Sequence, residues 1–304
     1  MVRTHLSALI IGYARRDNIA RLSEQFFKLS TGYLYIHLDK GKTKDIQLLQ
    51  REIIEIFSNH PMRSRIFLMT TSQNLGVKYG VISAIDWFYT HEEIGIILED
   101  DLIASDDFYE FIDLNKDFLI MNDDVMMLSG VKLVNDGQVS RATWTNYAQI
   151  WGWATTNSKW KLLRAAIFDD PSNNSSRQRM NVKFFWKIGS WKVRNELIDT
   201  WDIPVSEFML RKEKYCLVPN VNMILNIGND HFATHTKNPI EQFAIHSDAI
   251  ENYEGVVGED KYLISKKYNR LLEDKIFKIE YIHYFLIFKL WIEKFRFFIN
   301  RFFL

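Results

Sequence analysis

The chain has 304 residues and equal numbers of acidic and basic side chains, so its formal net charge is zero and gives no surplus of positive charge for nucleic acid. A hydrophobic content of 47% is typical of a globular protein with a substantial core. The single cysteine, Cys216, excludes an intramolecular disulfide framework and fits a reducing compartment.

Short apolar runs rich in β-branched residues alternate with segments of helical spacing through the first half of the chain. We expect strands over 6–12, 33–38, 66–69, 94–98 and 125–128, and helices over 18–29, 45–57, 77–90 and 106–119. This alternation predicts an α/β fold with a mostly parallel sheet covered on both faces. Ligands of such sheets bind beyond the carboxyl ends of the strands.

Three polar loops follow the predicted strands: GYARRD after the first, LDKGK after the second and EDD after the fourth. Adjacent carboxylates at the end of a buried strand (Glu99, Asp100 and Asp101) are costly unless a cation meets them. Mg²⁺ and Mn²⁺ prefer such oxygens and usually accompany a phosphate-bearing substrate. The alternative is that the triplet is a solvated acidic turn that caps the following helix and binds no ligand. Because the three loops converge on one edge of the sheet, we favour the metal or phosphate site.

Phosphate-binding glycine motifs are absent from the sequence: it contains neither GxGxxG nor GxxxxGK[ST]. Bound phosphates would therefore need a metal and basic side chains such as Arg15, Arg16 or Lys78.

Aromatic residues are concentrated in the second half. Between residues 144 and 191 the tryptophans are Trp144, Trp151, Trp153, Trp160, Trp186 and Trp191. Tryptophan is usually a core residue, but an exposed ring also stacks on the apolar face of a sugar. Beside a metal site, exposed tryptophans would suit a carbohydrate acceptor.

Six sequence motifs, taken together in their order and spacing, are similar to those of a known protein family. They are QNLGVKYGVISAIDWFY (73–89), ILEDDLIASDDFYEF (97–111), WGWATTNSKWKLL (151–163), DTWDIPVSEFM (199–209), CLVPNVNMILNIG (216–228) and HFATHT (231–236). Over about residues 6–236 the chain resembles bacterial GT-A-fold (Rossmann-like) nucleotide-sugar glycosyltransferases related to the eukaryotic β-1,2-N-acetylglucosaminyltransferases. The resemblance implies metal-dependent, inverting transfer of a sugar from a nucleoside diphosphate donor, a UDP-sugar by preference, to a hydroxyl group. It divides the GT-A domain into a nucleotide-sugar-binding half, 1–140, and an acceptor-binding half, 141–265.

The resemblance also implies roles for individual residues. Asp101 would bind Mn²⁺ or Mg²⁺, with His235 as a further ligand, although His235 also fits an ordinary polar loop. The remaining donor-site residues would be Gly12, Tyr13, Arg15, Asp39, Asn74, Lys78, Glu99 and Asp100. Of these, Asp39 would lie beside the base of the nucleotide.

The expected general base is Asp202, in the segment DTWDIP. The eukaryotic enzymes carry a second acid directly after this WD pair, whereas this chain continues with Ile203. Asp199 or Glu207 would therefore be the alternative base. Asp202 also fits the first turn of a helix, where a carboxylate is favourable and Pro204 is well placed.

The last segment, 276–304, has aromatic residues on one wide helical face and mostly basic residues opposite. We expect residues 266–304 to form an amphipathic tail that binds an anionic membrane surface; packing on its own domain or in a dimer is the alternative. No stretch is long and uncharged enough to span a bilayer, and the start of the chain lacks a convincing secretory signal. The expected location is therefore the cytoplasmic face of the inner membrane.

Membrane contact would suit a glycan or lipid-linked acceptor in lipopolysaccharide or capsule synthesis. Two other functions remain open. One is a nucleotidyl- or phosphotransferase that uses the same acidic metal site. The other is a non-catalytic carbohydrate-binding module attached to the membrane, which would leave the acidic triplet without a role.

Overall fold

The computed structural model describes residues 3–137, 142–169, 178–228 and 264–279. The strands of the main sheet are β1 (Ser7–Gly12), β2 (Leu34–Leu38), β3 (Ile66–Thr70), β4 (Ile94–Glu99), β6 (Val125–Ser129), β7 (Ala142–Thr145), β8 (Trp153–Thr156) and β9 (Tyr215–Pro219). A small second sheet pairs β5 (Leu102–Ala104) with β10 (Ile224–Asn226). The helices are α1 (Arg16–Leu29), α2 (Lys44–Ser58), α3 (Gly76–Phe88), α4 (Asp106–Met121), α5 (Asn157–Phe168), α6 (Met180–Arg194), α7 (Asp202–Arg211) and α8 (Lys266–Leu271), with short turns η1 (Arg63–Arg65) and η2 (Leu272–Ile276).

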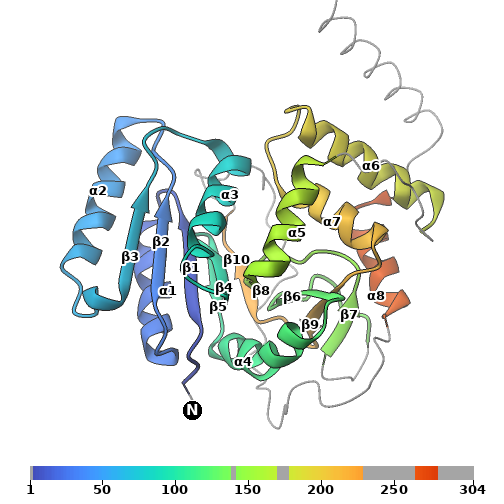
Figure 1. Cartoon of the computed structure of the whole chain (residues 1–304), viewed down its shortest axis with the longest axis horizontal. Helices are drawn as coiled ribbons and strands as arrows, with labels where there is room; N and C mark the ends of the chain where they lie inside the picture. Colours follow the sequence, from blue (N-terminus) through green and yellow to red (C-terminus); the bar gives the residue numbers. More distant parts are fainter. Residues whose placement is uncertain (1–2, 138–141, 170–177, 229–263, 280–304) are drawn as a thin grey trace, which may run out of the picture.

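The main sheet has the strand order β3-β2-β1-β4-β8-β6-β9-β7 (Figure 1). β8 and β7 run antiparallel to their neighbours, whereas the remaining strands share one direction. The expected α/β class, a mostly parallel sheet flanked by helices, is confirmed. Every strand and helix predicted for the first half is present, with ends that differ by only a few residues.

Helices cover both faces of the sheet because successive strand residues point to opposite sides. On β1, Ala8 and Ile10 pack into the core beneath α1, α2 and α4, while Leu9 packs into the core beneath α3, α5 and α7. A strand that is buried on both faces has apolar residues at successive positions. This is why the segment LSALIIG does not alternate between polar and apolar residues.

Most of the tryptophans in the second half are core residues. Trp144, Trp153, Trp160 and Trp186 are each no more than 7% exposed, so these four are core residues, as is usual for tryptophan, and do not offer a face to a sugar. Trp153, Trp160 and Trp186 are buried because α5, α6 and α7 pack over one face of β8 and β9, as Trp153 and Trp201 illustrate with rings stacked 5.7 Å apart. Trp144 belongs to the core on the other face, where its ring lies 5.5 Å from that of Phe118 on α4.

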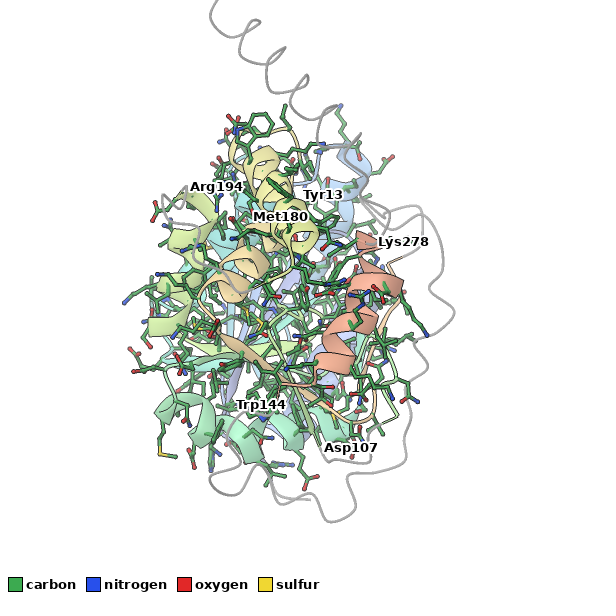
Figure 2. The ribbon with its side chains drawn as sticks, turned by 90° about the vertical axis from the view of Figure 1, so that its right-hand side faces the viewer. Tyr13, Asp107, Trp144, Met180, Arg194 and Lys278 are labelled. Atoms are coloured by element: carbon green, nitrogen blue, oxygen red, sulfur yellow. The ribbon has the colours of Figure 1, made fainter. Side chains whose placement is uncertain are left out.

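The segment 264–279 packs against the second half of the sheet. Ile264 bridges to Trp144, and the hydroxyl of Tyr147 donates to Glu273 at 2.7 Å. Figure 2 shows α8 on the same side of the molecule as α6, whose Trp186 contacts Phe277 edge-on. The predicted amphipathic tail lies, from residue 280 onward, outside the described residues. Within the described part, no helix combines the length and the apolar character needed to cross a bilayer.

Candidate functional site

The polar loops predicted to converge do meet at one edge of the main sheet. β1 lies between β2 and β4 in parallel register, with Gly12 opposite Leu38 and Ile11 opposite Glu99. The β1–α1 loop, Asp39 and the EDD triplet therefore leave the sheet together. Gly12 packs closely against α1, because a Cβ there would lie 2.8 Å from Cδ1 of Ile19 and would displace that side chain.

Asp100 binds the β1–α1 loop. Its Oδ2 accepts the backbone N–H groups of Tyr13 at 2.6 Å, Ala14 at 3.2 Å and Arg15 at 3.4 Å, and its Oδ1 accepts Nη1 of Arg15 at 2.8 Å. The carboxylate is only 5% exposed. The side chain of Asn18 in turn donates to the backbone carbonyl of Asp100 at 2.7 Å. In other α/β proteins, backbone N–H groups at this position often bind phosphate oxygens. Here they bind the carboxylate of Asp100 instead.

Tyr13 and Arg16 point away from the acidic triplet toward α2. The hydroxyl of Tyr13 accepts the backbone N–H of Lys42 at 3.0 Å, and its carbonyl accepts the amide of Gln50 at 2.8 Å. Arg16 pairs with Glu52 at 2.5 Å. These contacts fix the β1–α1 loop to the middle of α2 and to the loop that precedes it.

Burial makes ionisation of Asp101 and Glu99 unfavourable. Oδ1 of Asp101 is buried and accepts no hydrogen bond from the described residues. Burial, followed by the charge of Asp100, raises the pKa of Asp101 to about 6. Burial, together with the charges of Asp101, Asp100 and Asp202, raises the pKa of Glu99 well above its usual range. Two neighbouring carboxylates that resist ionisation are typical of a site that a cation completes.

The small β5–β10 sheet brings a further polar residue to Asp101. Asn226 pairs opposite Leu102, and a hydrogen bond from its side chain lowers the pKa of Asp101. The backbone N–H of Ile227 donates to the carbonyl of Asp101 at 2.8 Å. A Cβ on Gly228 would lie only 2.3 Å from Oδ2 of Asp101, so a larger residue here would displace that carboxylate. Asn226 and Gly228 were not among the predicted site residues, although their segment, LNIG, ends the motif CLVPNVNMILNIG (216–228).

The residues present fit a divalent cation. An unpartnered carboxylate oxygen on Asp101 and the carboxylate of Glu99 are hard oxygen ligands. The amide oxygen of Asn226 already accepts the backbone N–H of Gly228 at 2.7 Å, so Asn226 would support Asp101 as a hydrogen-bond donor. Among the described residues, no group of three or more acidic, histidine or cysteine side chains is arranged as a complete metal cage. A cation here would therefore depend on ligands from substrate, as Mg²⁺ does in many phosphate sites. His235, the other expected ligand, lies outside the described residues.

Asp39 and Asn74 hold the loop that precedes α3. Asp39 accepts hydrogen bonds from the hydroxyl of Thr71 at 2.9 Å, the amide of Asn74 at 3.0 Å and the backbone N–H of Leu75 at 2.9 Å. The amide of Asn74 also donates to the carbonyl of Lys40 at 2.7 Å. Both side chains lie beside the predicted donor site, and both already have protein partners.

Lys78 and Asp199 meet at the start of α3 instead of at the acidic triplet. Asp199 accepts the backbone N–H groups of Val77 at 3.0 Å and Lys78 at 2.9 Å. The ammonium of Lys78 donates to the carbonyl of Val193 at 3.2 Å and lies over the rings of Tyr79 and Phe168. Lys78 therefore faces α5 and α6, where it cannot balance phosphate charge at the triplet.

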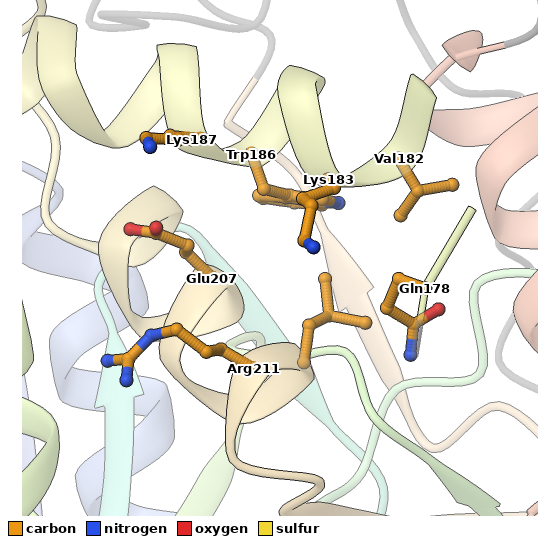
Figure 3. A pocket seen from close by; sticks show the side chains of 8 residues that line it. Gln178, Val182, Lys183, Trp186, Lys187, Glu207 and Arg211 are labelled. Atoms are coloured by element: carbon orange, nitrogen blue, oxygen red, sulfur yellow. The ribbon is translucent and has the colours of Figure 1, made fainter. Parts of the chain in front are cut away.

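Asp202 and Glu207 both lie on α7 but have different surroundings. Asp202 stands in the first turn and accepts the hydroxyl of Thr200, and its charge acts on Glu99. Glu207 pairs with Arg194 of α6 at 3.1 Å. It lines a cavity of about 20 Å³ between α6 and α7 (Figure 3), which has room for a single water. Among these residues, Asp202 has a charge that contributes to the raised pKa of Glu99.

Comparisons with known proteins give structural similarity only. No known protein-family description matches the chain, and no curated protein matches it. Among solved structures, apo UDP-glucose pyrophosphorylase aligns at 8% identity and a TM-score of 0.38, covering 72% of this chain and 90% of its own. A Bacillus anthracis protein assigned as a glucose-1-phosphate thymidylyltransferase, in complex with a sucrose, aligns at 11% identity and a TM-score of 0.32, covering 56% and 77%. Both names belong to the nucleotidyltransferase class, which is the alternative function, and neither supports a relation to the N-acetylglucosaminyltransferases.

Proposed function

We propose that the protein is a metal-dependent glycosyltransferase that uses a nucleoside diphosphate sugar. The observation that carries this proposal is the pair Glu99 and Asp101, which ends a central strand with raised pKa values and a buried, unpartnered oxygen. When bound, a divalent cation would neutralise the leaving diphosphate. Asp101, with Asn226 beside it, would hold that cation.

Asp202 is the proposed general base for the acceptor hydroxyl. Its carboxylate lies in the first turn of α7, which is distant from the triplet in the chain. Its charge nevertheless contributes to the raised pKa of Glu99. In direct transfer with inversion, the oxygen of the acceptor bonds to the anomeric carbon, the bond to the diphosphate breaks, and the base accepts the hydroxyl proton. The resemblance supports the inversion.

Nucleotidyl transfer is the second candidate because both solved structures named above carry nucleotidyltransferase names. Such an enzyme joins a nucleoside triphosphate to a sugar phosphate and releases pyrophosphate. The β1–α1 backbone donors of this chain are occupied by Asp100, so they are closed to the phosphates of a diphosphate and a triphosphate alike. What favours glycosyl transfer is the resemblance carried by the motifs 73–89, 97–111 and 199–209. We therefore rank glycosyl transfer first.

The deciding experiment measures which product is released. The protein is incubated with UDP-, GDP- and dTDP-sugars, and separately with nucleoside triphosphates and sugar 1-phosphates, each with Mn²⁺, Mg²⁺ or EDTA. Metal-dependent release of nucleoside diphosphate, as slow hydrolysis or as transfer to added saccharides, supports the proposal. Release of pyrophosphate supports the second candidate, and neither product under any condition contradicts both.

A matched pair of variants ties the activity to the site. Asp101→Asn removes the proposed ligand charge with little change in shape, and we expect it to abolish the metal-dependent release. Asp124→Asn is the control, because Asp124 is an exposed acid that pairs with Lys214 far along the chain from the triplet. Equal loss in both variants would show that the effect is not specific to the triplet.

A further inference from the structure

A second concave surface lies along the outer side of α3, apart from the acidic triplet. It has a volume of about 710 Å³ and is lined by residues from the end of β3, from α3 and from α5. Asn74 and Leu75, which bind Asp39, stand at one end of it, and Trp87 and Thr90 stand at the other. We call it the α3 groove. Its volume falls within the usual range for small-molecule sites, roughly 300–1,000 Å³.

The lining of the α3 groove combines aromatic rings with short polar side chains. Tyr79 is 41% exposed, and Trp87 is half-buried. Polar groups stand between and around these rings: Gln73, Ser83 and Thr90. An apolar ring flanked by hydrogen-bonding groups suits a ligand that has both an apolar face and many hydroxyl groups.

The charged groups of the groove cancel each other. Asp86 and Arg164 are its charged lining residues, and they form an ion pair at 2.7 Å. The carboxylate of Asp86 also accepts the indole N–H of Trp160 at 2.8 Å. The lining therefore has no net charge with which to attract a phosphate, a nucleotide or an acidic peptide.

The rings are held in place before any ligand arrives. Trp87 makes an edge-on contact with Tyr35, with ring centroids 5.4 Å apart, and the hydroxyl of Tyr79 bonds to Glu196 at 3.1 Å. Phe168 stacks on Tyr79 with centroids 6.4 Å apart. Side chains that are already ordered lose little entropy on binding, so weak stacking contacts can add up to measurable affinity.

We propose that the α3 groove binds a neutral glycan chain. Pyranose rings would stack on Tyr79 and Trp87, and their hydroxyl groups would bond to Gln73, Ser83 and the Asp86–Arg164 pair. The binding does not depend on the proposed catalysis, because none of these residues belongs to the acidic triplet. It would hold a polysaccharide on the surface of the protein next to the loop that carries Asp39.

The test uses neutral hexasaccharides of glucose, galactose, mannose and N-acetylglucosamine as probes. Binding is followed by tryptophan fluorescence and by saturation-transfer NMR on the full chain. We expect at least one probe to bind the wild type. Ser83→Trp, which fills the groove, should abolish binding, and Tyr79→Ala should weaken it roughly fivefold. Tyr33→Ala is the matched control, because Tyr33 is also an exposed tyrosine, at 47%, but lies outside the groove lining.

Competition with UDP and measurement of the oligomeric state test whether the groove instead binds a nucleotide or a second copy of the chain. Adding UDP with Mn²⁺, or introducing Asp101→Asn, should leave hexasaccharide binding unchanged. The proposal is overturned if no probe binds, if UDP displaces the bound probe, or if Tyr33→Ala weakens binding as much as Tyr79→Ala. It is also overturned if the wild type is a dimer that Ser83→Trp dissociates, since the groove would then be an interface between two copies.

Discussion

The carboxylate of Asp100 and the guanidinium of Arg15 form a buried ion pair at 2.8 Å, while the next residue, Asp101, keeps a buried oxygen without a hydrogen bond from the described residues. Two adjacent acids thus have opposite surroundings. Asp100 is satisfied by the β1–α1 loop, and Asp101 is destabilised by its neighbour. This difference predicts that replacing each acid will have an opposite effect on stability.

Asp100→Ala is expected to destabilise the protein. The substitution leaves the backbone N–H groups of Tyr13 and Ala14 without their acceptor and removes the carboxylate from Arg15. Loss of one partner from a buried pair costs about 3–5 kcal/mol. Urea unfolding followed by circular dichroism measures the change. A loss no larger than that of an exposed pair, such as Asp124→Ala beside Lys214, would contradict the structural role of Asp100.

Asp101→Asn is expected to stabilise the metal-free protein near neutral pH. Since burial and Asp100 raise the pKa of Asp101 to about 6, its ionised form is unfavourable in the folded state. Removing that charge should add about 1–3 kcal/mol to the free energy of unfolding measured in EDTA. The same variant should show no increase in melting temperature on addition of Mn²⁺ and nucleotide, whereas the wild type should. A less stable variant in EDTA would mean that Asp101 has a cationic partner.

Asp202→Asn and Asp199→Asn test whether Asp202 acts as the general base and Asp199 only caps α3. A general base contributes about 10²–10⁴-fold to rate, so Asp202→Asn should lower kcat by that factor and leave donor affinity nearly unchanged. Asp199 caps α3 through Val77 and Lys78, so Asp199→Asn should cost about 1 kcal/mol of stability and leave kcat within a few-fold. Both are measured from transfer rates over a range of donor concentrations. If Asp199→Asn carries the loss of kcat instead, Asp199 is the base.

The sheet and the meeting of the polar loops at one of its edges could be predicted from local sequence. Apolar runs alternate with helical spacing, and the acids of EDD directly follow one of those runs, so both signals are contained in short windows. Thr43 shows the same locality, because its side chain accepts the N–H of Ile46 and starts α2. Such features depend on near neighbours in the chain, and patterns of residue type report them well.

The partners of individual polar residues could not be predicted. Asp39, Asp100 and Asp199 each bind backbone N–H groups of another segment, and nothing in a carboxylate's own neighbourhood says which distant donors it will meet. Asn226 reaches Asp101 only because β10 pairs with β5 across the fold. The sequence predicts that Lys78 contacts a bound phosphate, but its side chain faces α6. Its ammonium lies over the ring of Phe168 and donates to the carbonyl of Val193, and both partners are distant in the chain.

His37 is expected to make the protein sensitive to acid. It is fully buried on β2 beside Trp87 and Asp39, and neither ring nitrogen has a partner among the described residues. Burial lowers its pKa from 6.5 to about 4, although the charge of Asp39 acts in the other direction. Between these values the unfolded chain binds the proton and the folded protein does not, so stability falls as the pH falls from about 6.5 to about 4.

His37→Leu isolates this contribution from that of the carboxylates. The variant removes two buried, unpaired nitrogens, so we expect no loss of stability near neutral pH. As the pH is lowered to about 4.5, the free energy of unfolding of the wild type should fall by roughly 2–3 kcal/mol more than that of the variant. Urea unfolding of both proteins over this pH range gives the difference directly. A difference that stays constant with pH would mean that His37 is protonated as readily in the folded protein as in the unfolded chain, through a partner that stabilises its charge.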